Sequence, residues 1–364
     1  MAGVYISYPF CAQKCTYCNF ASGVFPRELE SRYVETVRDE LKAMDWPWVP
    51  ETVYLGGGTP SLMTPEALAA MLAEIPNKPF SGRSWQEATM EAAPGNLDRE
   101  RIEGWREAGI NRVSLGVQSF VQKELARTGR RHTAEIVERE VALLRAAGIE
   151  SINVDLIAGL PGQNEASFRE SLDWVERLAV PHVSVYMLEV DDDSRLGREL
   201  IGLGSRYGAA DVPHEDAIAD FYELAVERME GMGIARYEIS NFARPGFESK
   251  HNLKYWKREP YLGFGSDAHS FDGTMRWQNP ESPAEYVANP RAIARTPADA
   301  RSEKYFLGLR LTEGVEPDAF PETIQRFVVD GLLERAGGRV RLTPRGVMLS
   351  NEVFAEFVGV ISSN

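Results

Sequence analysis

Three cysteines near the amino terminus are the residues whose type and spacing point most directly to chemistry. Cys11, Cys15 and Cys18 are the only cysteines in the 364-residue chain. An odd number of thiols in so short a segment indicates metal ligands or catalysis rather than a disulfide framework. Thiolates suit iron–sulfur clusters and zinc, but a zinc site usually adds a fourth Cys or His. Three thiolates on a four-iron cluster would leave one iron open, and a zinc site or inert buried thiols are the alternatives.

A glycine-rich loop and several polar side chains form a second group of candidates. Residues 56–60 read Gly-Gly-Gly-Thr-Pro, and consecutive glycines let the backbone approach a ligand closely. Glu91 could accept hydrogen bonds from hydroxyl groups, and Arg130 could approach a carboxylate. Gln118 follows a predicted strand, and Asp155 lies inside an apolar one, where a carboxylate needs a partner. The alternatives are a tight turn, solvated surface charges and a paired structural aspartate.

Alternating strands and helices must position these residues. Apolar periodicity predicts strands at 3–8, 52–55, 88–92, 112–115, 151–157 and 182–187. It predicts helices at 28–44, 65–75, 99–108, 133–147 and 165–178. This α/β alternation indicates a parallel sheet, and six units are too few to close an eight-stranded barrel. We therefore expect a partial, TIM-like (β/α)6 barrel over residues 1–190, with the candidate residues gathered at the carboxyl ends of its strands.

Composition excludes several classes of protein. A hydrophobic content of 43% and a charged content of 26% predict a packed globular protein. The net charge of −14 disfavours a nucleic-acid partner, which would need a basic stripe. No run of about 18 apolar residues occurs, so we expect no transmembrane segment. The first residues do not resemble a signal peptide, and we expect a cytoplasmic protein.

The remainder of the chain predicts two further units. Residues 191–290 are less regular, with a helix at 215–232 and a strand at 236–239, and we expect an α+β extension. Residues 291–364 predict helices at 303–309 and 323–330, a hairpin at 335–341 and a helix at 345–357. That order resembles a winged helix, for which we expect a packing, partner or lid role rather than DNA binding.

The cysteine motif carries a family resemblance. Cys11-x3-Cys15-x2-Cys18, with Tyr17 before the last cysteine, resembles the radical S-adenosylmethionine superfamily. The resemblance implies a [4Fe-4S] cluster held by the three cysteines. It further implies that the open iron binds the amine and carboxylate of S-adenosylmethionine.

The other motifs resemble a narrower family over nearly the whole chain. Their order and spacing are similar to those of the oxygen-independent coproporphyrinogen III oxidase group. The resemblance implies that S-adenosylmethionine is contacted by Tyr5, Gly58, Thr59, Glu91, Gln118, Arg130 and Asp155, with Tyr17 beside it.

Two departures separate the chain from the true oxidases of that group. Phe20 stands where the oxidases carry a fourth cysteine. The oxidases also carry a substantial amino-terminal extension before their cluster cysteines, whereas the first of these cysteines here is residue 11. The chain instead resembles the HemW-type haem chaperones, which share its Cys-x-Phe and the His-Asn-x-x-Tyr-Trp motif at 251–256. This resemblance implies haem as a ligand and haemoproteins, such as respiratory enzymes, as recipients, and it allows a homodimer.

The motif at 251–256 supplies a candidate haem ligand. Imidazole is a natural axial ligand for haem iron, and aromatic neighbours can cover a face of the macrocycle. His251, with the aromatic residues that follow it, is the first candidate, and His269 in a glycine-rich stretch is its rival. The alternative is that His251 is an ordinary hydrogen-bonded histidine.

We therefore expect a trafficking protein that holds a [4Fe-4S] cluster, S-adenosylmethionine and haem, and that delivers haem. We expect no coproporphyrinogen oxidase activity, and any catalysis would be that of a radical S-adenosylmethionine oxidoreductase. The alternatives are decarboxylation of coproporphyrinogen III, a reaction on another tetrapyrrole, and a scaffold without ligands.

Overall fold

A single curved sheet of twelve strands forms the frame of the protein. The structure, a computed structural model, describes residues 2–77, 85–290 and 294–358. The central strands are β1 (Gly3–Tyr8), β2 (Thr52–Gly57), β3 (Glu87–Ala92), β4 (Arg112–Gln118), β5 (Ser151–Ala158) and β6 (His182–Met187). They lie side by side in chain order and are all parallel. The six predicted strands and the open, partial barrel are therefore confirmed.

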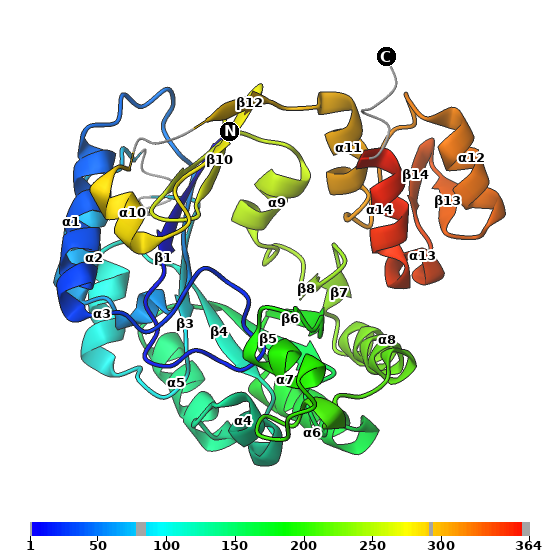
Figure 1. Ribbon diagram of the computed structural model, residues 1–364, viewed down its shortest axis with the longest axis horizontal. Coiled ribbons are helices and arrows are strands. Elements are labelled where there is room, and N and C mark those ends of the chain that lie inside the picture. Colours follow the sequence, from blue (N-terminus) through cyan, green and yellow to red (C-terminus); the bar gives the residue numbers. More distant parts are fainter. Residues whose placement is uncertain (1, 78–84, 291–293, 359–364) are drawn as a thin grey trace.

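Helices cover the convex face of this sheet (Figure 1). They are α1 (Arg27–Lys42), the short η1 (Pro60–Leu62), α2 (Pro65–Leu72), α3 (Arg99–Glu107), α4 (Gln122–Thr128), α5 (Ala134–Ala146) and α6 (Glu165–Leu178). All five predicted helices are present, each ending within a few residues of the prediction. Sequence periodicity missed α4, because two turns of helix give too few apolar repeats to detect.

The sheet does not stop at residue 190 but continues on both sides. Beyond β1 lie β9 (Tyr261–Phe264), β10 (His269–Phe271), β11 (Met275–Gln278) and β12 (Arg295–Pro297), and beyond β6 lie β8 (Asn241–Ala243) and β7 (Ala235–Arg236). Strand β9 runs parallel to β1, whereas β8 runs antiparallel to β6. The expected α+β extension is thus part of the same sheet. The predicted strand at 236–239 is wrong in its bounds, since β7 ends at Arg236.

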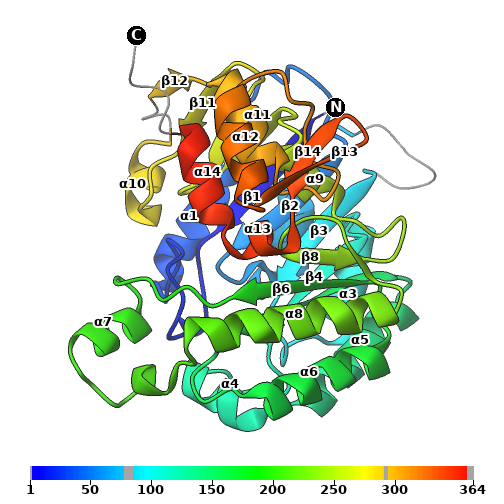
Figure 2. The same ribbon diagram turned by 90° about the vertical axis from the view of Figure 1, so that its right-hand side faces the viewer.

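The helices of this middle region are α7 (Arg195–Ile201), η2 (Ala209–Asp211), α8 (Glu215–Gly231), α9 (Lys250–Trp256) and α10 (Pro283–Ala288). Helix α8 covers β6 on the outside, continuing the row of α5 and α6 (Figure 2). Helix α9 differs from the others because it lies on the concave side of the sheet (Figure 1). No helix among the described residues is long and apolar enough to cross a membrane.

The carboxyl-terminal unit packs around its own aromatic core. It contains α11 (Ala300–Gly308), α12 (Pro321–Val329), the hairpin of β13 (Leu333–Ala336) and β14 (Arg339–Leu342), α13 (Pro344–Met348) and α14 (Ser350–Val358). Tyr305 and Phe357 stack at 4.9 Å between ring centroids. The predicted order of helices and hairpin is confirmed, but the single helix at 345–357 is wrong. The chain leaves the helical region at Leu349 and restarts as α14.

Tyr33 ties α1 to the junction between the barrel and its added strands. Its ring is 1% exposed. Its hydroxyl donates to the Ser7 carbonyl at 2.8 Å and accepts from the Ser266 amide at 2.7 Å. A methyl group on Gly265 would lie 2.3 Å from the same hydroxyl. One phenol therefore fixes the end of β1 against the turn that follows β9.

Removing this hydroxyl should destabilise the fold. Tyr33→Phe leaves a buried amide and a buried carbonyl without their partner, and we expect it to lower the free energy of unfolding by about 1–3 kcal/mol. Urea denaturation measures the change. Tyr207→Phe is the control, since its half-buried hydroxyl makes no hydrogen bond with the described residues, and we expect a change within about 0.5 kcal/mol. Equal stabilities of the two variants would contradict this role.

Candidate functional site

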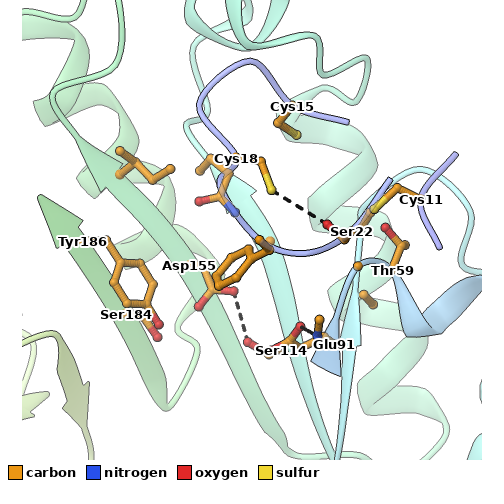
Figure 3. A pocket seen from close by; sticks show the side chains of 18 of the residues that line it. Cys11, Cys15, Cys18, Ser22, Thr59, Glu91, Ser114, Asp155, Ser184 and Tyr186 are labelled. Carbon is orange, nitrogen blue, oxygen red and sulfur yellow. Dashed lines mark hydrogen bonds between the residues drawn. The ribbon is translucent and has the colours of Figure 1, made fainter. Parts of the chain in front are cut away.

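A cavity of about 300 Å³ occupies the inside of the barrel and opens to solvent. Figure 3 shows the side chains that line it, with the loop that carries Cys11, Cys15 and Cys18 at the top of the view. Ten of the predicted residues line it: Cys11, Cys15, Tyr17, Cys18, Gly58, Thr59, Glu91, Gln118, Arg130 and Asp155. The structure thus brings together side chains from the loops and carboxyl ends of five strands, as expected for a barrel of this class.

The cysteine loop is fixed by its backbone and leaves the thiols directed at the cavity. The Cys11 amide donates to the Gly23 carbonyl at 2.8 Å, and the Thr16 amide donates to the Thr128 carbonyl at 3.3 Å. All three cysteines are half-buried and free of disulfides. Burial raises the pKa of the Cys11 thiol, and hydrogen bonds from nearby hydroxyls oppose the rise.

The spread of the thiols bears on which metal group they fit. Among the residues that the structure describes, no three His, Cys, Asp or Glu side chains converge on a point that could hold one metal ion. Zinc needs its ligands to meet at a single ion. In a [4Fe-4S] cluster each thiolate binds a different iron, so the thiols must surround a volume instead. Three free thiols lining one cavity are the donor set that a cluster with one open iron would need.

The glycine loop approaches the cysteine loop too closely for any side chain. The Gly58 amide donates to the Tyr8 carbonyl at 2.8 Å, and the Thr59 amide donates to the Phe10 carbonyl at 2.9 Å. A Cβ atom on Gly58 would lie 2.8 Å from the Phe10 carbonyl oxygen, a distance that real Cβ atoms do not show. Glycine is therefore required here to bring the two loops to one ligand.

Glu91 is a carboxylate held at the cavity wall. Tyr54 donates its hydroxyl to one carboxylate oxygen at 2.8 Å, and the Gly57 amide donates to the other at 3.2 Å. Burial raises the pKa of Glu91 to about 7, and the nearby Asp155 adds to the rise. Each oxygen keeps a lone pair, so the ionised group could accept hydrogen bonds from ligand hydroxyls.

Asp155 has the partners that its place in an apolar strand required. Ser114 donates to it at 3.1 Å and Asn153 at 2.7 Å. Burial raises the pKa of this carboxyl, and its hydrogen bonds oppose the rise. Sequence reasoning missed both partners and Ser184, which Asn153 also contacts at 3.0 Å. The sequence did contain a signal for them, since Ser114, Asn153 and Ser184 each stand between two apolar residues on three adjacent strands.

Arg130, Tyr17 and Gln118 also line the cavity. Arg130 donates to the Gly116 carbonyl at 2.6 Å and to the Tyr17 hydroxyl at 3.4 Å. Its buried Nε has no partner among the described residues, so the guanidinium retains hydrogen-bonding capacity. Gln118 has a φ of 72° just after a bulge in β4. A non-glycine residue held in that region costs free energy and often marks a functional position.

Tyr5 is the predicted contact that the structure does not place in the cavity lining. Its ring stacks on that of Tyr54 at 6.1 Å between centroids and fills the space beside Gly56. A tyrosine on β1 therefore supports the wall through Tyr54 rather than facing the cavity.

His251 does not have the environment expected of a haem ligand. Its side chain is fully buried, with Nδ1 2.9 Å from the Thr52 hydroxyl and Nε2 2.7 Å from the Tyr255 hydroxyl. Both ring nitrogens are occupied, so neither can coordinate iron in this structure. The half-buried Tyr255 packs edge-on against the buried Tyr261 at 4.6 Å between ring centroids. The rival candidate His269 is exposed on β10.

Comparisons with known proteins agree with this geometry. Residues 5–175 match the radical SAM superfamily model, and residues 296–349 match the HemN C-terminal domain. The heme chaperone HemW of Lactococcus lactis is 33% identical over 97% of this chain and 96% of its own. That of Bacillus subtilis is 34% identical over 99% of this chain and 100% of its own.

The solved structure of the coproporphyrinogen III oxidase HemN from Escherichia coli shares the fold. It superposes with a TM-score of 0.78, covering 99% of this chain and 90% of its own at 20% identity. At that identity the match establishes the architecture alone.

The raised pKa of Glu91 predicts a pH-dependent stability. The folded protein binds this proton at a pKa of about 7, against an ordinary value of 4.5. The resulting stabilisation is complete below the ordinary value and is lost as the pH rises through 7. We therefore expect wild type to lose free energy of unfolding relative to Glu91→Gln between about pH 5 and pH 8.

Urea denaturation of both proteins at the two pH values measures this difference. The exposed Glu100→Gln is the matched control and should follow wild type at both values. If wild type and Glu91→Gln changed in parallel with pH, the assignment of the raised pKa to Glu91 would be wrong.

Proposed function

Since the chain belongs to the radical S-adenosylmethionine superfamily, in the family of the relatives named heme chaperone HemW, we propose that it is a haem chaperone. In this proposal it binds a [4Fe-4S] cluster, S-adenosylmethionine and haem, and it delivers haem to recipient haemoproteins. The observation that carries the proposal is the similarity to these relatives over the whole chain. Phe20 supports the chaperone over the oxidase, because it stands where the oxidases carry a further cysteine. It is 65% exposed at the mouth of the cavity.

The cavity residues have defined parts in this proposal. Cys11, Cys15 and Cys18 would hold the cluster, which supplies an open iron and an electron when bound. Gly58 and Thr59 would offer backbone groups to the methionyl part of S-adenosylmethionine, and Glu91 would accept bonds from its ribose hydroxyls. The remaining proposed contacts are Tyr17, Gln118, Arg130 and Asp155, with Tyr5 acting through Tyr54.

The geometry favours His269 over His251 as the haem ligand. Coordination requires a ring nitrogen that is accessible and unprotonated. His269 is exposed at the surface, and the partial loss of hydration of its imidazole lowers its pKa, which favours the neutral ring. His251 would have to give up two buried hydrogen bonds before it could reach iron.

Metal analysis tests the cluster. After anaerobic reconstitution we expect about four iron and four sulfide per chain, because three thiolates can hold one [4Fe-4S] cluster. Replacing Cys11, Cys15 and Cys18 together by Ser should lower both values to near zero. Iron and sulfide near zero in the wild type would support a scaffold without ligands instead.

Haem titration tests the ligand. Under reducing conditions with an intact cluster, we expect haem to shift the Soret band of wild type and of His251→Ala. We expect His269→Ala to lose that shift, because the His269 ring is accessible whereas the His251 ring is buried. His214→Ala is the matched control, since that histidine is also exposed, with 80% of its side chain accessible. Loss of the shift in His251→Ala alone would reverse this assignment. No shift in the wild type would refute the chaperone function, and anaerobic formation of protoporphyrinogen would favour the oxidase.

A further inference from the structure

A buried guanidinium faces the lower half of the cavity, away from the cysteine loop. Arg112 is the first residue of β4 and only 2% exposed, yet it lines the cavity. Its guanidinium donates no hydrogen bond to any described residue, and its Nε is buried without a partner. Burying a charge in this state is costly unless a partner from outside the chain completes it.

Among the residues that the structure describes, Glu87 is the one acid in ion-pair range of Arg112, but its oxygens accept hydrogen bonds from other groups. Its Oε2 lies 3.9 Å from the Arg112 Nε, too far for a hydrogen bond. The two oxygens accept instead from the Lys250 and His251 amides, both at 2.9 Å, and from the Ser249 hydroxyl at 3.4 Å. Glu87 therefore binds the amino end of α9 and leaves the guanidinium directed at the cavity.

Helix α9 closes the amino end of the barrel. Its His251 bonds Thr52, and the ring would lie 3.0 Å from a Cβ on Gly3. Gly3, Thr52 and Glu87 are the first residues of β1, β2 and β3, so α9 is anchored to three strand starts at once. This anchoring places the next residue, Asn252, on the cavity lining.

We name the lower end of the cavity the barrel floor. It consists of Arg112, Asn153, Ser184, Asn241 and Asn252. The Asn252 side chain makes no hydrogen bond with the described residues and so has its amide donors available. The predicted contacts to S-adenosylmethionine use none of these five residues.

We propose that the barrel floor binds a carboxylate of the ligand in the cavity, with Arg112 as its ion-pair partner and Asn252 as a second donor. His251 and Glu87 are positioning residues that hold α9, and through it Asn252, at the floor. A guanidinium with unused N–H groups suits a carboxylate, which it can bind through two parallel hydrogen bonds.

Other charges also face Arg112. Asp155 and Glu91 share the cavity, and they lower the affinity of the floor for anions. Asp155 already accepts from Ser114 and Asn153, and Glu91 accepts from Tyr54 and Gly57. These carboxylates accept hydrogen bonds from donors of their own, whereas Arg112 has no hydrogen-bond acceptor among the described residues. A ligand that supplies an acceptor would therefore complete the cavity.

The identity of the carboxylate rests on the proposed function. A haem propionate supplies this chemistry. The carboxylate of S-adenosylmethionine shares it, although the family resemblance assigns that carboxylate to the open iron at the cysteine loop, and paired ligands distinguish the two sources. The full-length, anaerobically reconstituted protein is titrated with haem and its dimethyl ester, which lacks free carboxylates. It is also titrated with S-adenosylhomocysteine and with methylthioadenosine, which lacks the amino acid part.

We expect Arg112→Gln to weaken binding of the carboxylate-bearing ligand about tenfold or more, and to change binding of its carboxylate-free analogue about twofold at most. Asn252→Asp is a second, nearly isosteric variant that adds a negative charge to the floor. It should weaken the same ligand and spare the analogue, even if Arg112→Gln fails to fold. Lys250→Ala, exposed on the same helix, is the control and should bind like wild type. His251→Gln should weaken the same ligand selectively if it positions Asn252.

The outcomes separate this inference from the proposed function. Selective loss of haem assigns the floor to a propionate, and selective loss of S-adenosylhomocysteine assigns it to the methionyl carboxylate. If wild type binds haem but no variant weakens the carboxylate-bearing ligand more than its carboxylate-free analogue, the floor site is overturned and the proposed function is retained. Binding of none of the four ligands by wild type overturns both.

Discussion

A barrel with polar side chains inside is stable only if those side chains satisfy one another, and this requirement governs the structure. Ordinary barrels fill their interior with layers of branched apolar residues. Here Asn153 is the centre of the network that replaces them. Its amide nitrogen donates to Ser114 and Asp155, both at 2.7 Å, and lies 3.0 Å from the Ser184 hydroxyl. Its oxygen lies 2.6 Å from His182 Nδ1. Such a network fixes its members in place while leaving room for a ligand above them.

The network also connects the barrel to the strands added after it. Ser184 donates to Asn241 on β8, and Asn241 donates to the buried Glu238. Glu238 lies 3.5 Å from Arg310, at the start of the carboxyl-terminal unit. A second buried acid, Glu303 on α11, pairs with Arg258 after α9 and with Arg276 on β11. Two acidic residues thus hold the last unit against both the sheet and the helix that closes the barrel.

Local patterns in the sequence predicted the parts of the fold that local forces decide. Strands β1 to β6 and their helices carry periodic apolar residues, and the ten cavity residues follow from their place at strand ends. Pairing of β9 with β1 joins residues more than 250 positions apart, which periodicity cannot reveal. The surroundings of His251 could not be predicted for a related reason. Its motif was visible, but Thr52 and Tyr255, which occupy its ring nitrogens, became neighbours only through folding.

The place of β1 in the sheet has a consequence for how the protein matures. This strand is synthesised long before its outer neighbour β9, which begins only at Tyr261. Contacts of such long sequence separation form slowly during folding. Until most of the polypeptide has been synthesised, the strand that carries the cysteine loop has one open edge. The frame around the cavity is therefore complete only when residues 261–264 are available to pair with β1.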